Sequence, residues 1–135
     1  MDVKKSFQIE QLENFRMINS ELKALNSQIE NTYNTYHSPA IGNGRNSVPG
    51  DPTARAIEKL SKLQDLYSIK YVSMTKLLDE IETWINTIEN TEIRSIIRWH
   101  YLLGLSWKQT SKKVYGYNSY YNARKAFYRF MGKEK

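Results

Sequence analysis

Cysteine is absent from this chain of 135 residues. A disulfide framework and a thiolate metal site are therefore both excluded, and the absence is typical of a protein kept in a reducing cytoplasm. Long apolar runs are absent too, since no segment approaches the roughly 18 apolar residues that a membrane-spanning helix needs. The start of the chain, Met1 to Ser6, has no apolar signal core after its lysines. We therefore expect a cytoplasmic protein without a membrane span.

Residues that carry catalysis or hold metals are few. The two histidines, His37 and His100, have no histidine or carboxylate nearby at the spacing of metal ligands. The motifs Gly-x-Ser-x-Gly and His-Glu-x-x-His are both missing. The segment Gly42-Asn43-Gly44 lacks the Gly-Lys-Ser/Thr ending of a phosphate-binding loop. We expect no metal, no cofactor and no enzymatic activity.

Acidic residues are scarce in one part of the chain only. Residues 1–91 hold ten basic and twelve acidic side chains, a net charge of −2, whereas residues 92–135 hold ten basic and two acidic side chains, a net charge of +8. A near-neutral scaffold joined to a strongly basic end indicates one module that binds a polyanion. The simpler interpretation, a solvated lysine-rich terminus, fits less well because aromatic residues that need burial lie between the charges.

The first predicted helix runs from about Ser6 to Tyr36. Its apolar residues recur at steps of three, four and seven, which is the stripe of a coiled coil or a helical hairpin. They are Phe15, Ile18, Leu22, Leu25, Ile29 and Tyr36.

Residues 37–51 are predicted to form a flexible loop, because they contain three of the six glycines and two of the three prolines. A second helix is predicted from Pro52 to about Glu89, with Asp51 as its N-cap. Its apolar residues follow heptad spacing, with Gln64 the one polar residue in the stripe. They are Ile57, Leu60, Tyr67, Tyr71, Met74, Leu78, Ile81, Ile85 and Ile88.

The two helices together predict an all-α fold that begins with a long antiparallel hairpin over residues 1–90. The matching stripes also suit a contact between two chains, so a homodimer through the hairpin is the alternative. Residues 91–135 are predicted to form a second, three-helix module with a helix-turn-helix. No strand pattern is present anywhere in the chain.

The three helices of this module carry terminal signals. Thr91 is predicted to cap a helix over residues 92–103, which Gly104 ends. Ser106 and Gln109 have the spacing of a capping box at the start of the next helix. Gly116 marks the following turn.

The last helix, over residues 119–131, begins at a cap formed by Asn118 or Ser119 and is predicted to turn Ala123, Phe127 and Phe130 inward. Its remaining residues suit the major groove of DNA, where lysine or arginine pairs with guanine and asparagine with adenine. Base contacts are expected from its first turns, and phosphate contacts from the lysines before it and from its far end. The predicted DNA-binding residues are Lys108, Lys112, Lys113, Tyr120, Tyr121, Asn122, Arg124, Lys125 and Arg129.

Two segments of the basic end resemble a known family. The segment YLLGLSWKQ (residues 101–109) is similar to the helix-turn-helix opening of the phage RinA/ArpU-type transcription regulators, relatives of the fourth conserved region of sigma factors. The segment ARKAFYRF (residues 123–130) is similar to their recognition helix, and residues 38–54 resemble their glycine-rich connection before an Asp-Pro-Thr helix start. The resemblance implies a phage or prophage regulator in a Gram-positive bacterium, acting on late or packaging-gene promoters.

The chain departs from the family pattern at two places. Thr110 and Ser111 replace the usual pair of an apolar residue and alanine, and the turn from Tyr115 to Ser119 is about one residue longer than the sigma-like turn. Both departures bear on how the last helix would dock.

Three hypotheses about function remain open from the sequence. The first is a sequence-specific regulator of transcription that binds double-stranded DNA, with a hairpin that forms a homodimer or contacts host RNA polymerase. The second is a small terminase subunit or another adaptor for phage DNA packaging. The third is a protein-interaction module whose basic end binds an acidic surface of a host factor.

Overall fold

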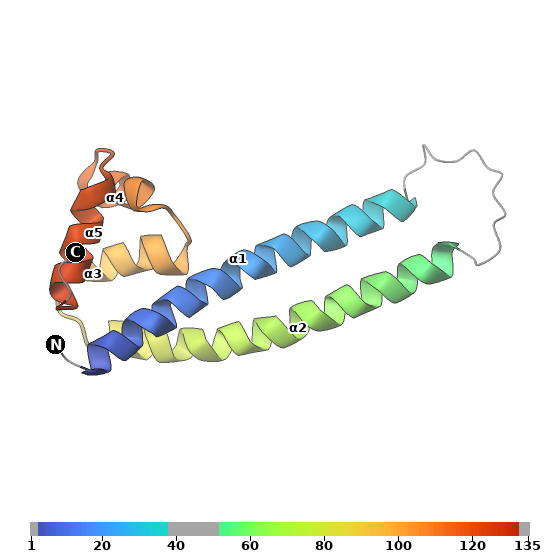
Figure 1. Ribbon diagram of the computed structural model, residues 1–135, viewed down its shortest axis with the longest axis horizontal. Helices are drawn as coiled ribbons and strands as arrows, with labels where there is room; N and C mark the ends of the chain where they lie inside the picture. The colour runs from blue at the N-terminus through green and yellow to red at the C-terminus, as the bar shows by residue number, and fades with distance from the viewer. Residues whose placement is uncertain (1–2, 38–51, 133–135) are drawn as a thin grey trace. The chain divides into compact units, whose positions relative to one another are not determined.

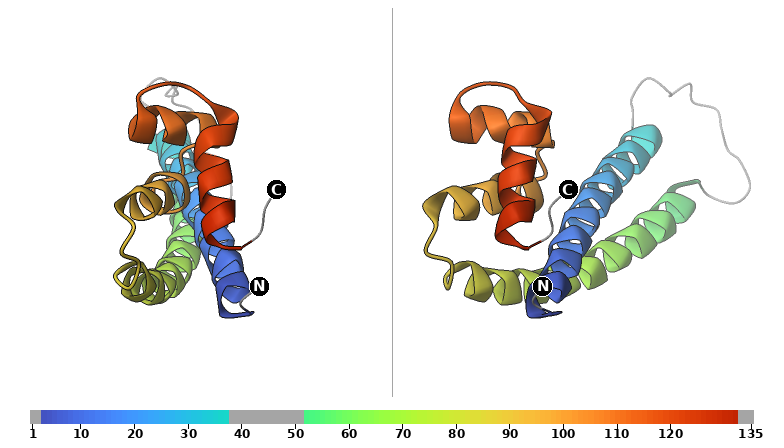
Figure 2. Two further views of the ribbon diagram at one scale, coloured as in Figure 1. Left: turned by 90° about the vertical axis from the view of Figure 1, so that its left-hand side faces the viewer. Right: turned by 60° about the vertical axis from the view of Figure 1, so that its left-hand side comes forward.

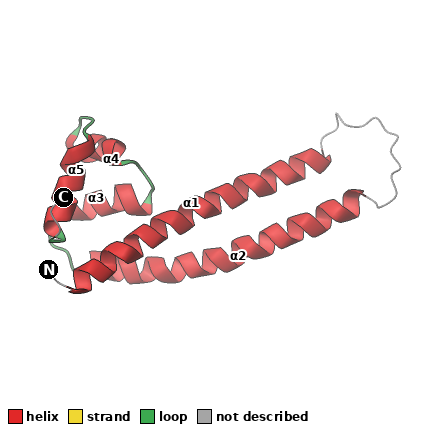
Figure 3. Ribbon diagram, in the orientation of Figure 1, coloured by secondary structure: helices red, strands yellow, loops and turns green. Residues whose placement is uncertain are grey.

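The computed structural model describes residues 3–37 and 52–132 of the chain (Figure 1). Within these two ranges the secondary structure is helical, with turns and short links between the helices and no strand (Figure 3). The predicted all-α class is confirmed, and so is its arrangement as a long antiparallel hairpin followed by a helical C-terminal module.

The hairpin consists of α1 (Val3–His37) and α2 (Pro52–Ile85). The C-terminal module consists of α3 (Thr91–Ile96), which continues as the π-helix η2 (Ile97–Leu102), then α4 (Trp107–Tyr115) and α5 (Tyr120–Phe130). Helix α2 begins at Pro52 as predicted. The predicted flexible loop over residues 37–51 lies outside the described residues, apart from His37, where α1 ends.

The chain divides into two compact units, one of residues 1–20 with 74–135 and one of residues 21–73. Both long helices therefore contribute to both units. The predicted division into residues 1–90 and 91–135 stays a prediction.

In the unit of residues 21–73, the inward stripe of α2 differs from the predicted one. Ala56 is buried, and half-buried residues follow at steps of four and three. They are Leu60, Leu63, Tyr67 and Lys70. Lys70 forms an ion pair in this half-buried position, since its Nζ lies 3.2 Å from Oε1 of Glu21.

The prediction was wrong at three positions of this stripe. Ile57 is 62% exposed, Tyr71 is 49% exposed, and Gln64 is exposed. The predicted stripe shares Leu60 and Tyr67 with the inward one but takes Ile57 in place of Ala56. A residue one position later lies about 100° further around the helix, on the flank of the inward face.

In the unit of residues 1–20 and 74–135, the C-terminal helices lie beside the first turns of α1 and the last turns of α2 (Figure 2). Side chains from all of these helices form one hydrophobic core. Tyr101 and Phe127 are the largest fully buried side chains. Met131 is fully buried as well, whereas Phe130, which was predicted to point inward, is only half-buried. The other core residues are Ile9, Leu12, Phe15, Ile81, Ile85, Ile88, Ile93, Ile96, Ile97 and Ala123.

The link between hairpin and C-terminal module differs from the prediction at both ends. Helix α2 ends at Ile85 and not near Glu89, since Ile88 donates its backbone N–H to the carbonyl of Ile85 in a tighter turn. The N-cap of α3 is Asn90 and not Thr91. The Oδ1 of Asn90 accepts from the backbone N–H groups of Glu92 and Ile93, which a residue one position later cannot reach in the same geometry.

Candidate nucleic-acid interface

The helix-turn-helix is built by local caps that the sequence predicted. Oγ of Ser106 accepts the backbone N–H of Gln109 at 3.1 Å, and Oε1 of Gln109 accepts the N–H of Ser106 at 2.9 Å, so the capping box of α4 is complete. Gly116 ends α4 with a φ of 92°, a left-handed conformation that favours glycine. Ser119 caps α5 by accepting the N–H of Asn122 at 3.2 Å.

A buried hydroxyl joins α4 to α5. Ser111 is fully buried, and its Oγ accepts the backbone N–H of Ala123 at 3.1 Å. Because both residues are small, the two helices approach closely at this point. Thr110 is fully buried too, but its Oγ1 has no hydrogen-bond partner. The two neighbouring polar residues thus differ in effect: the hydroxyl of Ser111 stabilises the helix pair, whereas the unpaired hydroxyl of Thr110 costs free energy.

Beneath α5 lies a cluster of aromatic side chains. The imidazole of His100 stacks on the indole of Trp107, with ring centroids 3.6 Å apart, and Tyr101 contacts Phe127 at 5.1 Å. Burial lowers the pKa of His100 to about 4, helped by the positive charge of Arg16, so the ring is neutral. Its Nδ1 lies 2.7 Å from the carbonyl oxygen of Leu105 and, facing an acceptor, carries the proton. These rings pack together beneath α5 and support it.

The guanidinium of Arg16 on α1 satisfies the carbonyl groups that lead from η2 into α4. Its Nε donates to the carbonyl of His100 at 3.0 Å, and its Nη2 donates to Gly104 and Leu105 at 3.2 Å each. Asn19 adds a bond from Nδ2 to the carbonyl of Leu102 at 3.3 Å. The end of a π-helix leaves carbonyls without helical partners, and these two side chains of α1 supply the donors.

One stripe of α5 carries three polar side chains with exposed atoms. Asn122, Lys125 and Arg129 are all exposed, and together with Ala126 they have the i, i+3, i+4, i+7 spacing of one helix face. With Tyr115 of α4 they line a hollow of about 360 Å³. We name Asn122, Lys125 and Arg129 the polar stripe.

Arg124 lies on a different stripe of the same helix. It is half-buried, and its guanidinium lies 5.6 Å from the ring centroid of Tyr120 and 5.1 Å from that of Tyr128. Cation–π contacts on both sides hold it along the helix. The structure therefore does not bring Arg124 together with Asn122, although the sequence grouped them.

The remaining predicted residues are exposed. The rings of Tyr120 and Tyr121 contact each other at 5.0 Å, and Tyr121 is 62% exposed. On α4, Nζ of Lys112 donates to the carbonyl of Gly116 at 3.3 Å, and Nζ of Lys113 lies 5.1 Å from the Trp99 ring. Lys108 is exposed near the start of that helix.

Tyr117 is a residue that sequence reasoning missed. Its hydroxyl accepts a hydrogen bond of 2.6 Å from Nδ2 of Asn122, and its ring lies against that of Tyr115 with centroids 6.2 Å apart. It stands in the turn between α4 and α5, where a tyrosine carries no helical spacing that would mark it as functional.

The charged side chains of α4 and α5 are all positive. No aspartate or glutamate occurs between Glu92 and Glu134 in the sequence. Within the described ranges, Lys108, Lys125 and Arg129 form no ion pair. Glu92 accepts a hydrogen bond from the hydroxyl of Tyr115, whose pKa is raised above its usual range by burial and by this carboxylate. The polar stripe is thus cationic and has no acidic side chain beside it on its own helix.

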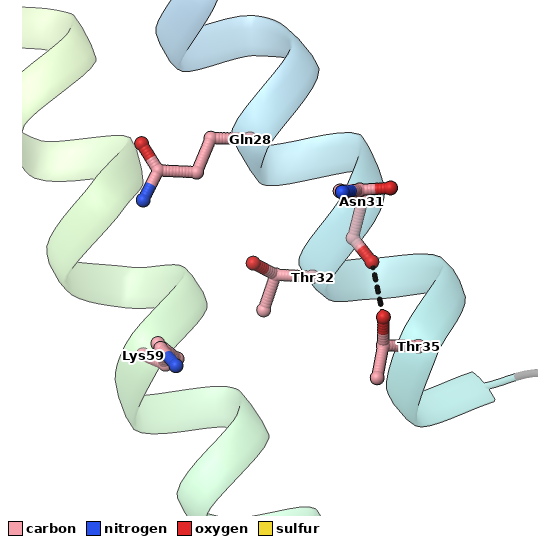
Figure 4. Close-up of a pocket in the computed structure, with 5 residues that line it drawn as sticks. All are labelled: Gln28, Asn31, Thr32, Thr35 and Lys59. Carbon is pink, nitrogen blue, oxygen red and sulfur yellow. Dashed lines mark hydrogen bonds between the residues drawn. The ribbon is translucent and has the colours of Figure 1, made fainter.

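A hollow of the hairpin offers fewer charged groups than the one beside the polar stripe. Its volume is about 180 Å³, it lies between α1 and α2 in the unit of residues 21–73, and it is lined by polar residues with a single charge, that of Lys59 (Figure 4). The others are Gln28, Asn31, Thr32 and Thr35. Among the residues that the structure describes, no group of three or more histidines and carboxylates has the arrangement of a metal site. The helices of residues 3–37 and 52–132 include none with an apolar stretch long enough to cross a bilayer.

No protein-family model, no curated protein and no solved structure matches this chain.

Proposed function

We propose that the protein is a sequence-specific regulator of transcription that binds double-stranded DNA through α5. The observation that carries the proposal is the polar stripe, in which an amide and two cations share one exposed face of a helix fixed by its caps and by Ser111. Such a combination suits the major groove, whose floor presents donors and acceptors to an amide and whose phosphates attract cations.

The dimensions of α5 support groove insertion. Its 11 residues span about 16 Å at 1.5 Å per residue, enough to cross a groove that is about 12 Å wide. In the proposal, Asn122 and Lys125 contact base edges, because they lie nearer the start of the helix, and Arg129 contacts a phosphate.

In the proposal, the lysines of α4 contact the phosphates of the DNA backbone and so hold α5 in the groove. Lys108 and Lys112 are exposed and contribute charge without sequence information. Arg124 and Lys113 stack on aromatic rings, so we assign them a smaller share of binding than the polar stripe. The resemblance to the RinA/ArpU-type regulators supports a role at phage or prophage promoters.

In the proposal, the hairpin contacts a second copy of the chain or RNA polymerase. Three apolar residues of α2 support a protein contact, because they are exposed at a spacing of three. They are Leu66, Ile69 and Val72, with exposed fractions of 41%, 68% and 54%.

The experiment is selection of bound duplexes from a random library, followed by affinity measurements on the selected duplex and on random DNA at several salt concentrations. Lys125→Ala should weaken binding to the selected duplex by about 1–3 kcal/mol. Lys62→Ala removes the same charge from an exposed position of α2 and should leave binding unchanged. Equal losses from the two variants, or a library in which no duplex is enriched, would refute the proposal.

A further inference from the structure

The turn before α5 places a tyrosine hydroxyl against the side chain that the polar stripe presents first. Nδ2 of Asn122 donates to the hydroxyl of Tyr117 at 2.6 Å, while the backbone N–H of Asn122 donates to Ser119 at 3.2 Å. The residue is therefore held twice, its backbone by the cap of the helix and its amide by Tyr117. An exposed asparagine on a helix ordinarily has no such restraint.

Tyr117 is itself supported from the helices behind it. Its ring lies against the ring of Tyr115 with an interplanar angle of 31°, and the hydroxyl of Tyr115 donates to the carboxylate of Glu92 at the start of α3. Tyr115 is half-buried, so it cannot swing freely. A continuous series of contacts thus runs from Glu92 through the two tyrosines to the amide of Asn122.

The orientation decides which groups of the amide remain available. A carboxamide has two N–H donors and one oxygen acceptor. With one N–H bound to Tyr117, the second N–H and Oδ1 remain. Adenine presents N7 as an acceptor and N6 as a donor in the major groove, which is the complement of that remaining pair. Guanine presents two acceptors there and would leave Oδ1 without a donor.

We propose that Tyr117 is a positioning residue that fixes the amide of Asn122 to read one adenine. The inference rests on the proposed DNA binding and adds to it both the base and the device that selects it. Tyr117 acts through Asn122 and does not itself read the base.

The experiment compares three variants of the full chain on the selected duplex and on derivatives in which each base pair is replaced in turn. Asn122→Ala should abolish the preference at one A·T pair, a loss of about 5- to 150-fold in discrimination. Tyr117→Phe, which keeps the ring and removes only the hydroxyl, should reduce the preference at that same pair by at least about threefold. The affinity of Tyr117→Phe for a duplex in which that pair has been replaced should stay within about twofold of wild type. The variant loses only the orientation of the amide, which matters only when the A·T pair is present. Tyr67→Phe removes a hydroxyl from α2 and should change neither quantity.

The outcomes separate the inference from the proposed function. If Asn122→Ala loses discrimination at an A·T pair and Tyr117→Phe does not, the positioning role is refuted while DNA reading stands. A Tyr117→Phe variant that weakens all duplexes equally refutes it as well, because a purely structural role would act in that way. Discrimination lost at a G·C pair in Asn122→Ala refutes the choice of adenine. A wild-type chain that prefers no duplex overturns the proposed function and this inference together.

Discussion

Arg16 and His100 are 84 positions apart in the chain, and Nε of the first donates to the carbonyl of the second at 3.0 Å. The arginine belongs to the first half of α1, and the histidine belongs to the π-helix that leads into α4. The C-terminal module therefore takes part of its support from α1, both through this guanidinium and through the core residues Leu12 and Phe15.

A fragment of residues 91–135 should consequently be far less stable than the full chain. It lacks the apolar side chains of α1 and α2 that complete the core, and burial of one such side chain is worth about 1.5–3 kcal/mol. We expect no cooperative thermal transition by circular dichroism for the fragment, whereas the full chain should show one. A fragment that melts as sharply and at the same temperature as the full chain would show that α1 and α2 contribute nothing to the stability of the module.

Arg16→Ala should lower the free energy of unfolding by about 2 kcal/mol or more. It removes three hydrogen bonds from a charged donor, and it takes from the part-buried carbonyl of His100 its side-chain donor, whereas the carbonyl of Leu105 keeps the bond from His100. Urea unfolding measures the change. Arg55→Ala, at an exposed position of α2, is the matched control and should cost less than about 0.5 kcal/mol. Equal effects of the two variants would argue against the role of Arg16.

Two neighbouring substitutions in α4 should act with opposite sign. Ser111→Ala removes the acceptor of the Ala123 N–H and should cost about 1–2 kcal/mol. Thr110→Val replaces a buried hydroxyl that has no partner by a methyl group of similar size, so it should stabilise by about 1 kcal/mol. Both values come from the same denaturant titration, and a destabilised Thr110→Val variant would show that the hydroxyl does find a partner in solution.

Stability should fall as the pH is lowered from 7.5 to 5, because of His100. Its pKa is about 4 in the folded protein and about 6.5 when unfolded, so the unfolded chain binds the proton first as the pH falls. The loss should be about 2 kcal/mol by pH 5. His100→Gln retains a donor for the carbonyl of Leu105 and should be less stable at pH 7.5, with a smaller dependence on pH in this window. An unchanged dependence in His100→Gln would assign the effect to other groups.

The sequence predicted those features that depend on neighbouring residues. Capping by Ser106 and Gln109, the left-handed Gly116 and the inward Ala123 and Phe127 are each specified within one or two helical turns. The prediction that Ile57 of α2 faces inward was wrong. Ala56 lies on the inner face, but an isoleucine one residue later is the stronger apolar signal in the sequence.

The contacts that position the candidate site were harder to predict. The bonds from Arg16 cross more than 80 residues, and a π-helix of 6 residues is too short for its wider spacing to show in the sequence. The separation of Arg124 from Asn122 follows from their 200° difference around α5, a geometry available from the sequence, but the stacking on Tyr120 and Tyr128 depends on side-chain conformations.

Mapping the backbone amides that respond to DNA tests the central claim most directly. A selected duplex would be titrated into isotope-labelled full-length protein and followed by NMR. We expect the largest shift changes between Tyr117 and Arg129, with little change over residues 54–73 of α2. Changes confined to the hairpin, with the amides of α5 unaffected, would contradict the claim that this helix is the DNA-binding element.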